Sequence, residues 1–300
     1  WGYARGGMGS ITKAMASSFK SKNGEIKAGS PVTKILIKNN KSYGLVLENG
    51  DEIYADKIVS NLDVKRTFLK VVEEKELPND FYKAVKNFKI RGSSGKLNIA
   101  LDDLPIWKSI PEGDPAGTGD LHITQNIEEM EGAYDDWKDG KWSQFPYVDM
   151  CIPSINDPTM APQGKHYMSV FIQYVPYNLA DGGWTEEKRL EFGKHVMGRI
   201  GNYSTNFNDI INHAEIRTPK ELEAEVGLTE GNIFQGELTM DQLMFNRPVP
   251  GYAQYKTPIK NLYMCGSSTH PGGGVMGAPG ANAAREILKD LNKKMSTHYI

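Results

Sequence analysis

A glycine-rich run near the carboxyl end, Cys265 to Ala284, limits the folds open to this 300-residue chain more than any other feature. Five of its glycines lie within nine residues, 272–280, and glycine lets backbone N–H groups approach a ligand closely. A short apolar segment, Leu262–Met264, precedes the run, and the spacing of apolar residues after it predicts a helix over 282–295. A strand, a glycine turn and a helix start therefore follow one another, an order that exposes N–H donors and the positive end of a helix dipole.

Such a turn suits an electron-rich ligand group, either a phosphate or the N1–C2=O2 edge of a reduced flavin. The run is not a P-loop, because no Gly-Lys-Ser/Thr follows it. Residues 272–277 match G-x-G-x-x-G, but no further strand can bring an acidic residue about twenty positions on. The alternative that needs no ligand is a glycine loop that closes a structural strand–helix turn.

Composition excludes several classes of partner. Hydrophobic residues make up 39% of the chain and charged residues 24%, which is typical of a soluble globular protein, and a formal net charge of −2 argues against nucleic acid. Cys151 and Cys265 stand far apart without a C-x-x-C motif, which favours a reducing compartment, either the cytoplasm or, in a eukaryote, the mitochondrial matrix. No run reaches the roughly eighteen apolar residues of a transmembrane helix. The loop around Trp107 permits a peripheral membrane contact, and the sequence also permits a homo-oligomer.

The order of elements predicts an α/β fold in which one domain is formed by two separate segments of the chain, before and after a long insertion. After 6–10 we expect a helix whose inner face carries Ile11, Met15 and Phe19, then a β-meander over 32–55 with a turn at Asn49-Gly50. Residues 57–60 read as a strand buried in a parallel sheet. The chain opens at Trp1 inside a motif, so we expect a piece of a longer or processed protein.

Residues 63–244 predict an α+β excursion with mixed or antiparallel sheet. Strands are expected at 95–101, 121–124, 148–152 and 167–175, with the long apolar last one in the middle of a sheet. Helices are expected at 78–88, from Thr185 to about 200, and after the capping box that begins at Thr218. The predicted division is thus 1–62 and 245–300 for one domain and 63–244 for a second.

These residues resemble the second part of the FAD-dependent amine oxidase and phytoene desaturase superfamily. The amino-terminal resemblance lies in Gly6–Gly9, Val32–Ile35, Asn49-Gly50 and Ile58–Asn61, and the carboxyl-terminal FAD motif in Leu262–Ser267 and Pro271–Ala278. Five further stretches narrow the resemblance to one branch: Cys151–Ser154, Asp157–Pro162, Gln173–Tyr177, Gly231–Phe234 and Arg247–Pro250.

The resemblance implies a partial FAD-binding, doubly wound Rossmann-like domain with a β-meander, plus a substrate-binding domain. The βαβ unit that opens the family fold with G-x-G-x-x-G is not recognisable at the start of this chain: Gly7 and Gly9 have the right spacing, but Thr12 stands where the third glycine belongs, and no strand precedes them. The resemblance therefore implies that this portion of the family fold is absent from the sequence. We therefore expect FAD in the intact enzyme, whereas this chain lacks the family's segment that holds the pyrophosphate and the adenosine. The cofactor-binding residues implied are Val32, Gly266, Ser267, Gly273, Gly274, Val275, Met276, Gly277, Ala278 and Asn282.

The resemblance places Gly6 and Gly7 at the border of a cavity for cofactor and substrate. His270 is a further cavity candidate, because a histidine side chain can serve as an acid or a base and it stands in the glycine loop. Tyr167, Phe171 and Gln173 are spaced by even numbers of residues along one predicted strand, so they share one of its faces. That face is either ordinary sheet core or a wall for an elongated apolar substrate.

The first functional hypothesis is a flavoenzyme that takes a hydride from a small apolar substrate, isoprenoid-like as in the desaturases; no catalytic residue is identified. The second is a non-catalytic module, since the same fold serves Rab escort and GDP-dissociation-inhibitor proteins. A third is an inactive fragment that needs its amino-terminal part. No H-x-x-x-H or G-x-S-x-G motif occurs, so neither a metal site nor a serine hydrolase is expected.

Overall fold

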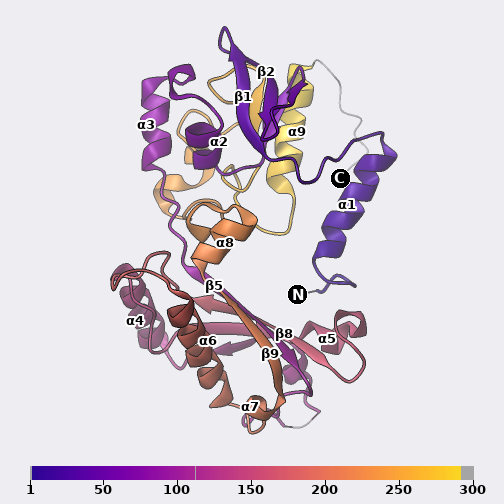
Figure 1. Ribbon diagram of the computed structural model, residues 1–300, viewed down its shortest axis with the longest axis vertical. Coiled ribbons are helices and arrows are strands. Elements are labelled where there is room, and N and C mark those ends of the chain that lie inside the picture. Colours follow the sequence, from indigo (N-terminus) through magenta and orange to yellow (C-terminus); the bar gives the residue numbers. More distant parts are fainter. Residues whose placement is uncertain (1, 112, 292–300) are drawn as a thin grey trace. The chain divides into compact units, whose positions relative to one another are not determined.

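A computed structural model describes residues 2–111 and 113–291 of the chain (Figure 1). The chain divides into two compact units, unit 1 from Trp1–Ile26 and Gly92–Val226 and unit 2 from Lys27–Arg91 and Gly227–Ile300. Each unit has its own hydrophobic core and is described by itself. The boundaries of the two units differ from those of the expected domains, which are 1–62, 63–244 and 245–300. The assignment of these domains to cofactor and substrate stays a prediction.

Unit 1 is built on a five-stranded antiparallel sheet with the strand order β6-β7-β8-β5-β9. Its strands are β5 (Ser94–Leu101), β6 (Leu121–Ile123), β7 (Tyr147–Cys151), β8 (His166–Gln173) and β9 (Ile211–Arg217). Its helices are α1 (Gly9–Ser21), α4 (Ile127–Lys138), α5 (Pro153–Asn156), α6 (Glu186–Gly201), α7 (Phe207–Ile210) and α8 (Pro219–Val226). The expectation that the long apolar strand lies in the middle of a sheet is confirmed by the position of β8.

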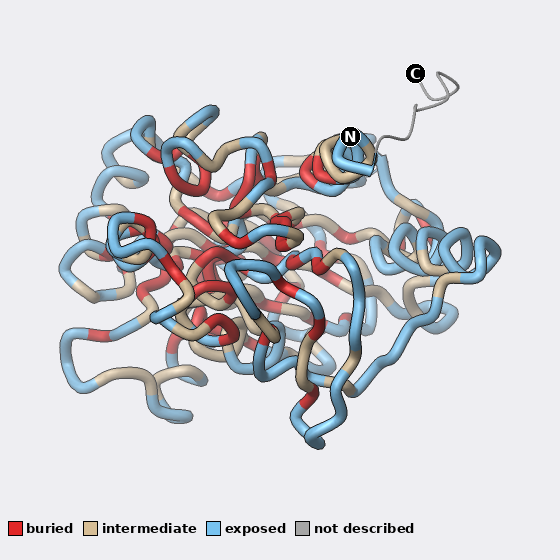
Figure 2. Tube along the Cα trace, turned by 90° about the horizontal axis from the view of Figure 1, so that it is seen from above, coloured by how far each residue is buried: buried red, intermediate tan, exposed pale blue. Residues whose placement is uncertain are grey.

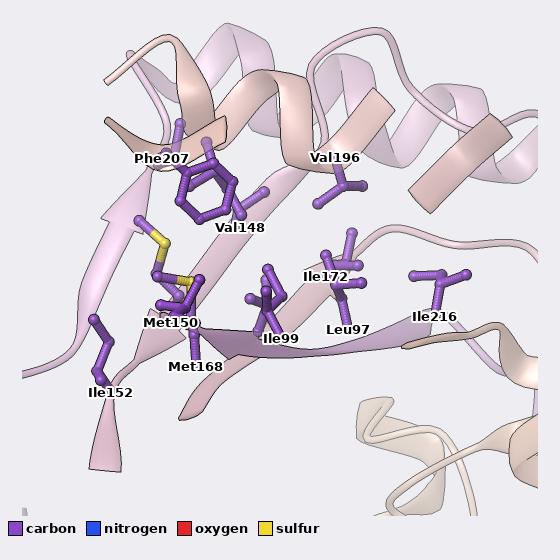
Figure 3. Close-up of a cluster of buried hydrophobic side chains, with 14 of the residues drawn as sticks. Leu97, Ile99, Val148, Met150, Ile152, Met168, Ile172, Val196, Phe207 and Ile216 are labelled. Atoms are coloured by element: carbon purple, nitrogen blue, oxygen red, sulfur yellow. The ribbon is translucent and has the colours of Figure 1, made fainter. Parts of the chain in front are cut away.

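The core of unit 1 lies on one face of this sheet, because the strand period of two sends alternate side chains to it. Along β5, Leu97, Ile99 and Leu101 are buried, and Figure 3 shows Leu97 and Ile99 converging with side chains of the neighbouring strands and of helix α6. Helix α6 contributes Phe192 and Val196, both fully buried. Thr185 caps α6 as predicted, its hydroxyl accepting a hydrogen bond from the N–H of Lys188 at 3.2 Å.

Unit 2 combines the predicted β-meander with a short parallel strand pair. The meander strands are β1 (Val32–Lys38), β2 (Lys41–Leu47) and β3 (Glu52–Tyr54), and the parallel pair joins β4 (Ile58–Ser60) to β10 (Leu262–Met264). The helices are α2 (Val64–Lys70), α3 (Asn79–Asn87) and α9 (Ala278–Asp290). Short 3-10 turns of the chain occur at Glu74–Glu76, Pro115–Thr118, Pro158–Met160, Thr229–Gly231, Met240–Gln242 and Met244–Asn246.

The core of unit 2 forms where α2 and α3 pack together. Phe68 and Phe81 meet edge to face with ring centroids 4.8 Å apart, and Val64 and Val85 are fully buried beside them. Buried residues, red in Figure 2, alternate along the chain with exposed ones because each element of either unit turns only one side inward.

Two predictions about helices need correction, and one helix was not predicted. Helix α1 has no buried residue among those described, so Ile11, Met15 and Phe19 do not form an inner face. Helix α9 begins at Ala278, four residues before the predicted start at 282, because Pro279 fits its first turn, and the predicted residues 292–295 lie outside the described part. Helix α4 is an element that the sequence analysis does not predict. No helix within 2–111 and 113–291 combines the length and apolar character needed to cross a bilayer.

Candidate functional site

The glycine-rich stretch begins where the chain after β10 passes close to the end of β4. A Cβ atom on Gly266 would lie 2.4 Å from the carbonyl oxygen of Asn61, so no larger residue fits there without movement of the backbone. Two fully buried hydroxyls fix the next turn. The Ser268 hydroxyl accepts from the N–H of Val64 at 3.0 Å, and the Thr269 hydroxyl donates to the carbonyl of Gly266 at 2.8 Å.

After this turn the stretch becomes exposed to solvent at residues 274–277. Gly272, Gly274 and Gly277 have φ angles of 106°, 131° and 63°, which other residues adopt rarely. Val275 is 74% exposed. Gly277 is the N-cap of α9, and no side chain caps that helix start. Its first N–H groups are therefore free to bind a ligand that accepts hydrogen bonds.

A cavity of about 520 Å³ opens in unit 2 at the carboxyl end of β4. Asn61 lines it and also contacts Gly266, so the cavity adjoins the glycine-rich stretch. Val32 is part of its wall, and its role beside the cofactor stays a prediction. The full lining is Pro31, Val32, Thr33, Ile35, Leu45, Ile58, Val59, Ser60, Asn61, Leu62, Arg66, Lys70 and Val71.

Two cationic side chains give the cavity its charge. Arg66 and Lys70 lie one helical turn apart on α2 and both line the cavity. The Arg66 Nε atom is buried without a hydrogen-bond partner, and its distance to the Asp63 carboxylate is 3.9 Å. A buried donor left unpaired costs roughly 1–3 kcal/mol, so a ligand with acceptor oxygens fits this cavity.

The other predicted cofactor residues also lie in unit 2, with different surroundings. Ser267 is half-buried, and Gly273 packs against Phe234, 3.3 Å from a hypothetical Cβ. Asn282 is already engaged: its amide donates to the Tyr255 hydroxyl at 2.8 Å and its oxygen accepts from Arg285 at 2.7 Å. Asn282 thus fastens α9 to the loop before β10.

His270 lies in unit 2 on the exposed part of the stretch. Its backbone carbonyl accepts a hydrogen bond from the Tyr255 hydroxyl at 2.7 Å, which fixes the main chain at this point. Its predicted role in substrate chemistry stays a prediction.

The remaining substrate candidates lie in unit 1. The N–H of Gly6 donates to the Asp157 carboxylate at 2.5 Å, and together with the Thr159 hydroxyl, the larger cause, this bond lowers the pKa of Asp157. Gly7 has a φ of 81°, and a Cβ there would lie 3.1 Å from the sulfur of Met160. Both glycines therefore serve a tight contact between the amino-terminal segment and the turn at 157–160.

Phe171 and Gln173 share one face of β8, as predicted, and lie half-buried on the side opposite the core. They are therefore not ordinary sheet core, because the alternate residues of β8 form that core, and their role as a substrate wall stays a prediction. This face is chemically mixed. Strand register places Phe171 opposite Lys96 on one side and Asp149 on the other, while Arg217 faces Lys96 from β9 and His122 faces Asp149 from β6.

Lys96 is the most unusual group on this face. Burial lowers its pKa, and its Nζ contacts the Ser169 hydroxyl. Burial also raises the pKa of Asp149 and of the Cys151 thiol. A half-buried lysine with a lowered pKa gives up its proton more easily than an exposed one.

Sequence reasoning missed Lys96, Asn61 and Arg66. Lys96 lies on the polar face of the β5 alternation, where a lysine is ordinary, so no local pattern distinguished it from an exposed lysine. Asn61 follows a buried parallel strand directly, and such carboxyl ends are the ordinary place for ligands in α/β folds. Nothing local distinguished Arg66 from the other cations of the chain.

Comparison with known proteins identifies the family. The model of the flavin containing amine oxidoreductase family matches residues 2–206. Pyridine nucleotide-disulfide oxidoreductase domain-containing protein 2 of Rattus norvegicus is 38% identical over 299 residues, covering 97% of this chain and 52% of that protein. Prolycopene isomerase 2 of an Oncidium hybrid cultivar is 27% identical, covering 96% of this chain and 46% of its own.

Solved structures agree on the fold. An oxidoreductase from Methanosarcina mazei superimposes with a TM-score of 0.58 at 19% identity, covering 95% of this chain and 55% of that one. Cyclohexylamine oxidase from Brevibacterium oxydans gives 0.56 at 13% identity, with 96% and 53% covered. The chain thus spans about half the length of the relatives that it matches. It belongs to the flavin-containing amine oxidoreductase family.

Proposed function

We propose that unit 2 holds part of an FAD and that the intact protein is a flavin-dependent oxidoreductase of the desaturase or dehydrogenase kind. The observation that carries the proposal is the uncapped amino end of α9 behind an exposed glycine turn. The cavity lined by Val32 supports it, because Asn61 in its wall approaches Gly266 at the start of the same glycine-rich stretch. Membership of the family supports the cofactor, and relatives named prolycopene isomerase and phytoene desaturase support an apolar, isoprenoid-like substrate.

The residues of unit 2 would divide the work of holding the cofactor. N–H groups at 273–278 would donate to the electron-rich edge of the ring system, which a helix dipole stabilises by about 0.3–1 kcal/mol when exposed. Val32 would flank the adenosine part, and Arg66 and Lys70 would offer charge to oxygens in the cavity. When bound, flavin accepts the hydride, so the protein needs only to position the substrate and handle a proton.

The open sheet face of unit 1 supplies groups for the substrate. Tyr167 and Phe171 offer apolar area, whereas Lys96 offers a proton acceptor once its ammonium is neutral. Because the two kinds of group share one face, we propose a substrate that is largely apolar and has one polar or acidic position. Lys96 is our candidate for the group that exchanges a proton there.

We further propose that the cofactor site is completed by polypeptide outside this sequence. Parallel strands normally lie buried in larger sheets, yet β4 and β10 form a pair of three-residue strands, and Val59 is 44% exposed. The apolar side chains on α1 are also exposed, among them Met15 at 62%. The half-length coverage of the relatives is consistent with both observations.

The test is flavin content of the protein expressed at the full length that its source encodes. We expect an absorbance spectrum of bound flavin, and at least tenfold weaker retention after Gly273→Val, because the added side chain would press against Phe234, 3.3 Å from its Cβ, and displace the turn. Gly280→Ala is the matched control, because its Cβ meets open space. A colourless protein that cannot be reconstituted with FAD would instead favour the non-catalytic escort module.

A further inference from the structure

Arg247 is the largest fully buried side chain in the described part of the protein, with an exposed fraction of 0%. No carboxylate in the described ranges pairs with it. Its guanidinium is satisfied by backbone carbonyls alone, and burial lowers its pKa to about 10. A buried cation is costly unless its donors are all paired, so this arrangement needs every acceptor in place.

The acceptors come from two separate segments of unit 2. Nε and Nη2 donate to the carbonyl of Ser267 at 3.1 and 2.9 Å, at the start of the glycine-rich stretch. Nη2 also reaches Phe234 at 2.8 Å, and Nη1 reaches Glu237 at 3.3 Å and Gln242 at 3.4 Å. The planar guanidinium of Arg247 therefore joins the loop 234–242 to the segment that leads into the glycine turn.

Packing around the guanidinium leaves it little freedom. Its carbon lies 5.9 Å from the centroid of the Phe88 ring, and a Cβ at Gly272 would lie 3.7 Å from its Nε. The loop 234–242 is held from its other side, since Gln242 exchanges hydrogen bonds with the backbone of Lys89 at 2.6 and 2.9 Å. Two direct links therefore join this fixed loop to the glycine-rich stretch: the guanidinium of Arg247, and the Ser268 hydroxyl, which donates to the carbonyl of Gln235 at 2.6 Å. Arg247 is the link that gathers several carbonyls of the loop at once.

We propose that Arg247 is a positioning residue that sets the conformation of residues 266–274, so that the glycine turn presents its N–H groups in a fixed place. The functional part of this inference rests on the proposed flavin role of that turn. Lysine cannot substitute, because an ammonium is a point donor whereas the acceptors around Arg247 match a planar fork.

The experiment measures amide hydrogen exchange, peptide by peptide, in the flavin-free protein at its full encoded length. In Arg247→Lys we expect exchange at least tenfold faster in 234–242 and 266–274, with α3 unchanged. Arg199→Lys is the matched control: Arg199 is also buried, at 7% exposure, but lies in unit 1 and pairs with Glu129 at 2.7 Å. That variant should leave both segments at the wild-type rate.

Chemical rescue separates positioning from general stability. In Arg247→Ala, millimolar guanidinium should restore protection of 266–274, and ammonium at equal concentration should not. Exchange in Arg247→Lys that equals wild type, or that rises uniformly through unit 2, overturns the proposal. Flavin absorbance of the same variants reports on the proposed function separately.

A second readout needs no variant and covers the case in which these variants fail to fold. The Nε–H of Arg247 in the wild-type protein should exchange with water at least a hundredfold more slowly than that of the exposed Arg5, as measured by nitrogen-15 NMR. Equal rates would contradict a fully paired guanidinium and with it the proposal.

Discussion

At the scale of single residues, the site depends on positions where only glycine fits, and the chain offers a matched pair to test this. A Cβ at Gly266 would meet Asn61 at 2.4 Å and the Gln235 Oε1 atom at 2.9 Å. We expect Gly266→Ala to lower the free energy of unfolding by about 1–3 kcal/mol through overpacking. Gly280→Ala, in open space within α9, should raise it by about 0.5–1 kcal/mol. Urea unfolding measures both, and equal effects would contradict the described close approach.

Lys96 gives the second prediction at this scale. Its folded pKa lies below the unfolded value near 10.5, so the unfolded chain holds the proton more tightly and stability rises with pH just below 10.5. Lys96→Met removes the buried charge. We expect the variant to be more stable than wild type by roughly 1 kcal/mol at pH 7, with the difference shrinking towards pH 10.5. Urea midpoints across this range measure it, and a constant difference would contradict the assigned burial.

At the scale of elements, helix α1 is the segment whose apolar side chains stay exposed. Met15→Glu should change the free energy of unfolding of this chain by less than about 0.5 kcal/mol, since Met15 is 62% exposed. In the protein at its full encoded length, the same change should destabilise measurably if further polypeptide covers α1. Thermal unfolding of both forms decides this, and equal small effects would refute the proposed cover.

Elements with strong local signals were predictable. The meander was recoverable because Asn39 and Asn40 both adopt left-handed φ angles at its first turn and Asn49-Gly50 forms the second. The capping box at α8 was predicted from the spacing of Thr218 and Glu221, and in the structure the Glu221 carboxylate accepts a hydrogen bond from the N–H of Thr218 at 2.7 Å. Helix α4 was missed although its N-cap, Asn126, accepts from Glu129 at 2.8 Å, because few of its residues are buried and its apolar stripe is weak.

The candidate site was predictable only where the chain itself carries the geometry. The glycine run is recognisable from the residue types themselves, so the exposed turn before α9 could be predicted from the sequence. Lys96 and Arg66 gain their character from strands and helices far along the chain that bury them, and no local pattern encodes that burial. The inner face expected for α1 failed for the same reason, because a periodic apolar stripe shows that a helix could be covered and not what covers it.

For the whole molecule, each unit should have its own free energy of unfolding, because each has its own hydrophobic core. Phe192→Ala in unit 1 and Phe68→Ala in unit 2 should each cost about 3–5 kcal/mol, because both rings are almost fully buried. Native-state hydrogen exchange should show the loss mainly within the unit that carries each change. Exchange that accelerates equally across both units would contradict independent cores.

The central claim is that the turn before α9, together with Val32, contacts a flavin dinucleotide. Its most direct test is hydrogen exchange of the protein at its full encoded length, with and without bound FAD. We expect amides of 272–280 and of Val32 to become at least tenfold better protected in the loaded form, while the α6 and β5 amides keep their rates. Flavin that binds while 272–280 exchanges at an unchanged rate would contradict it.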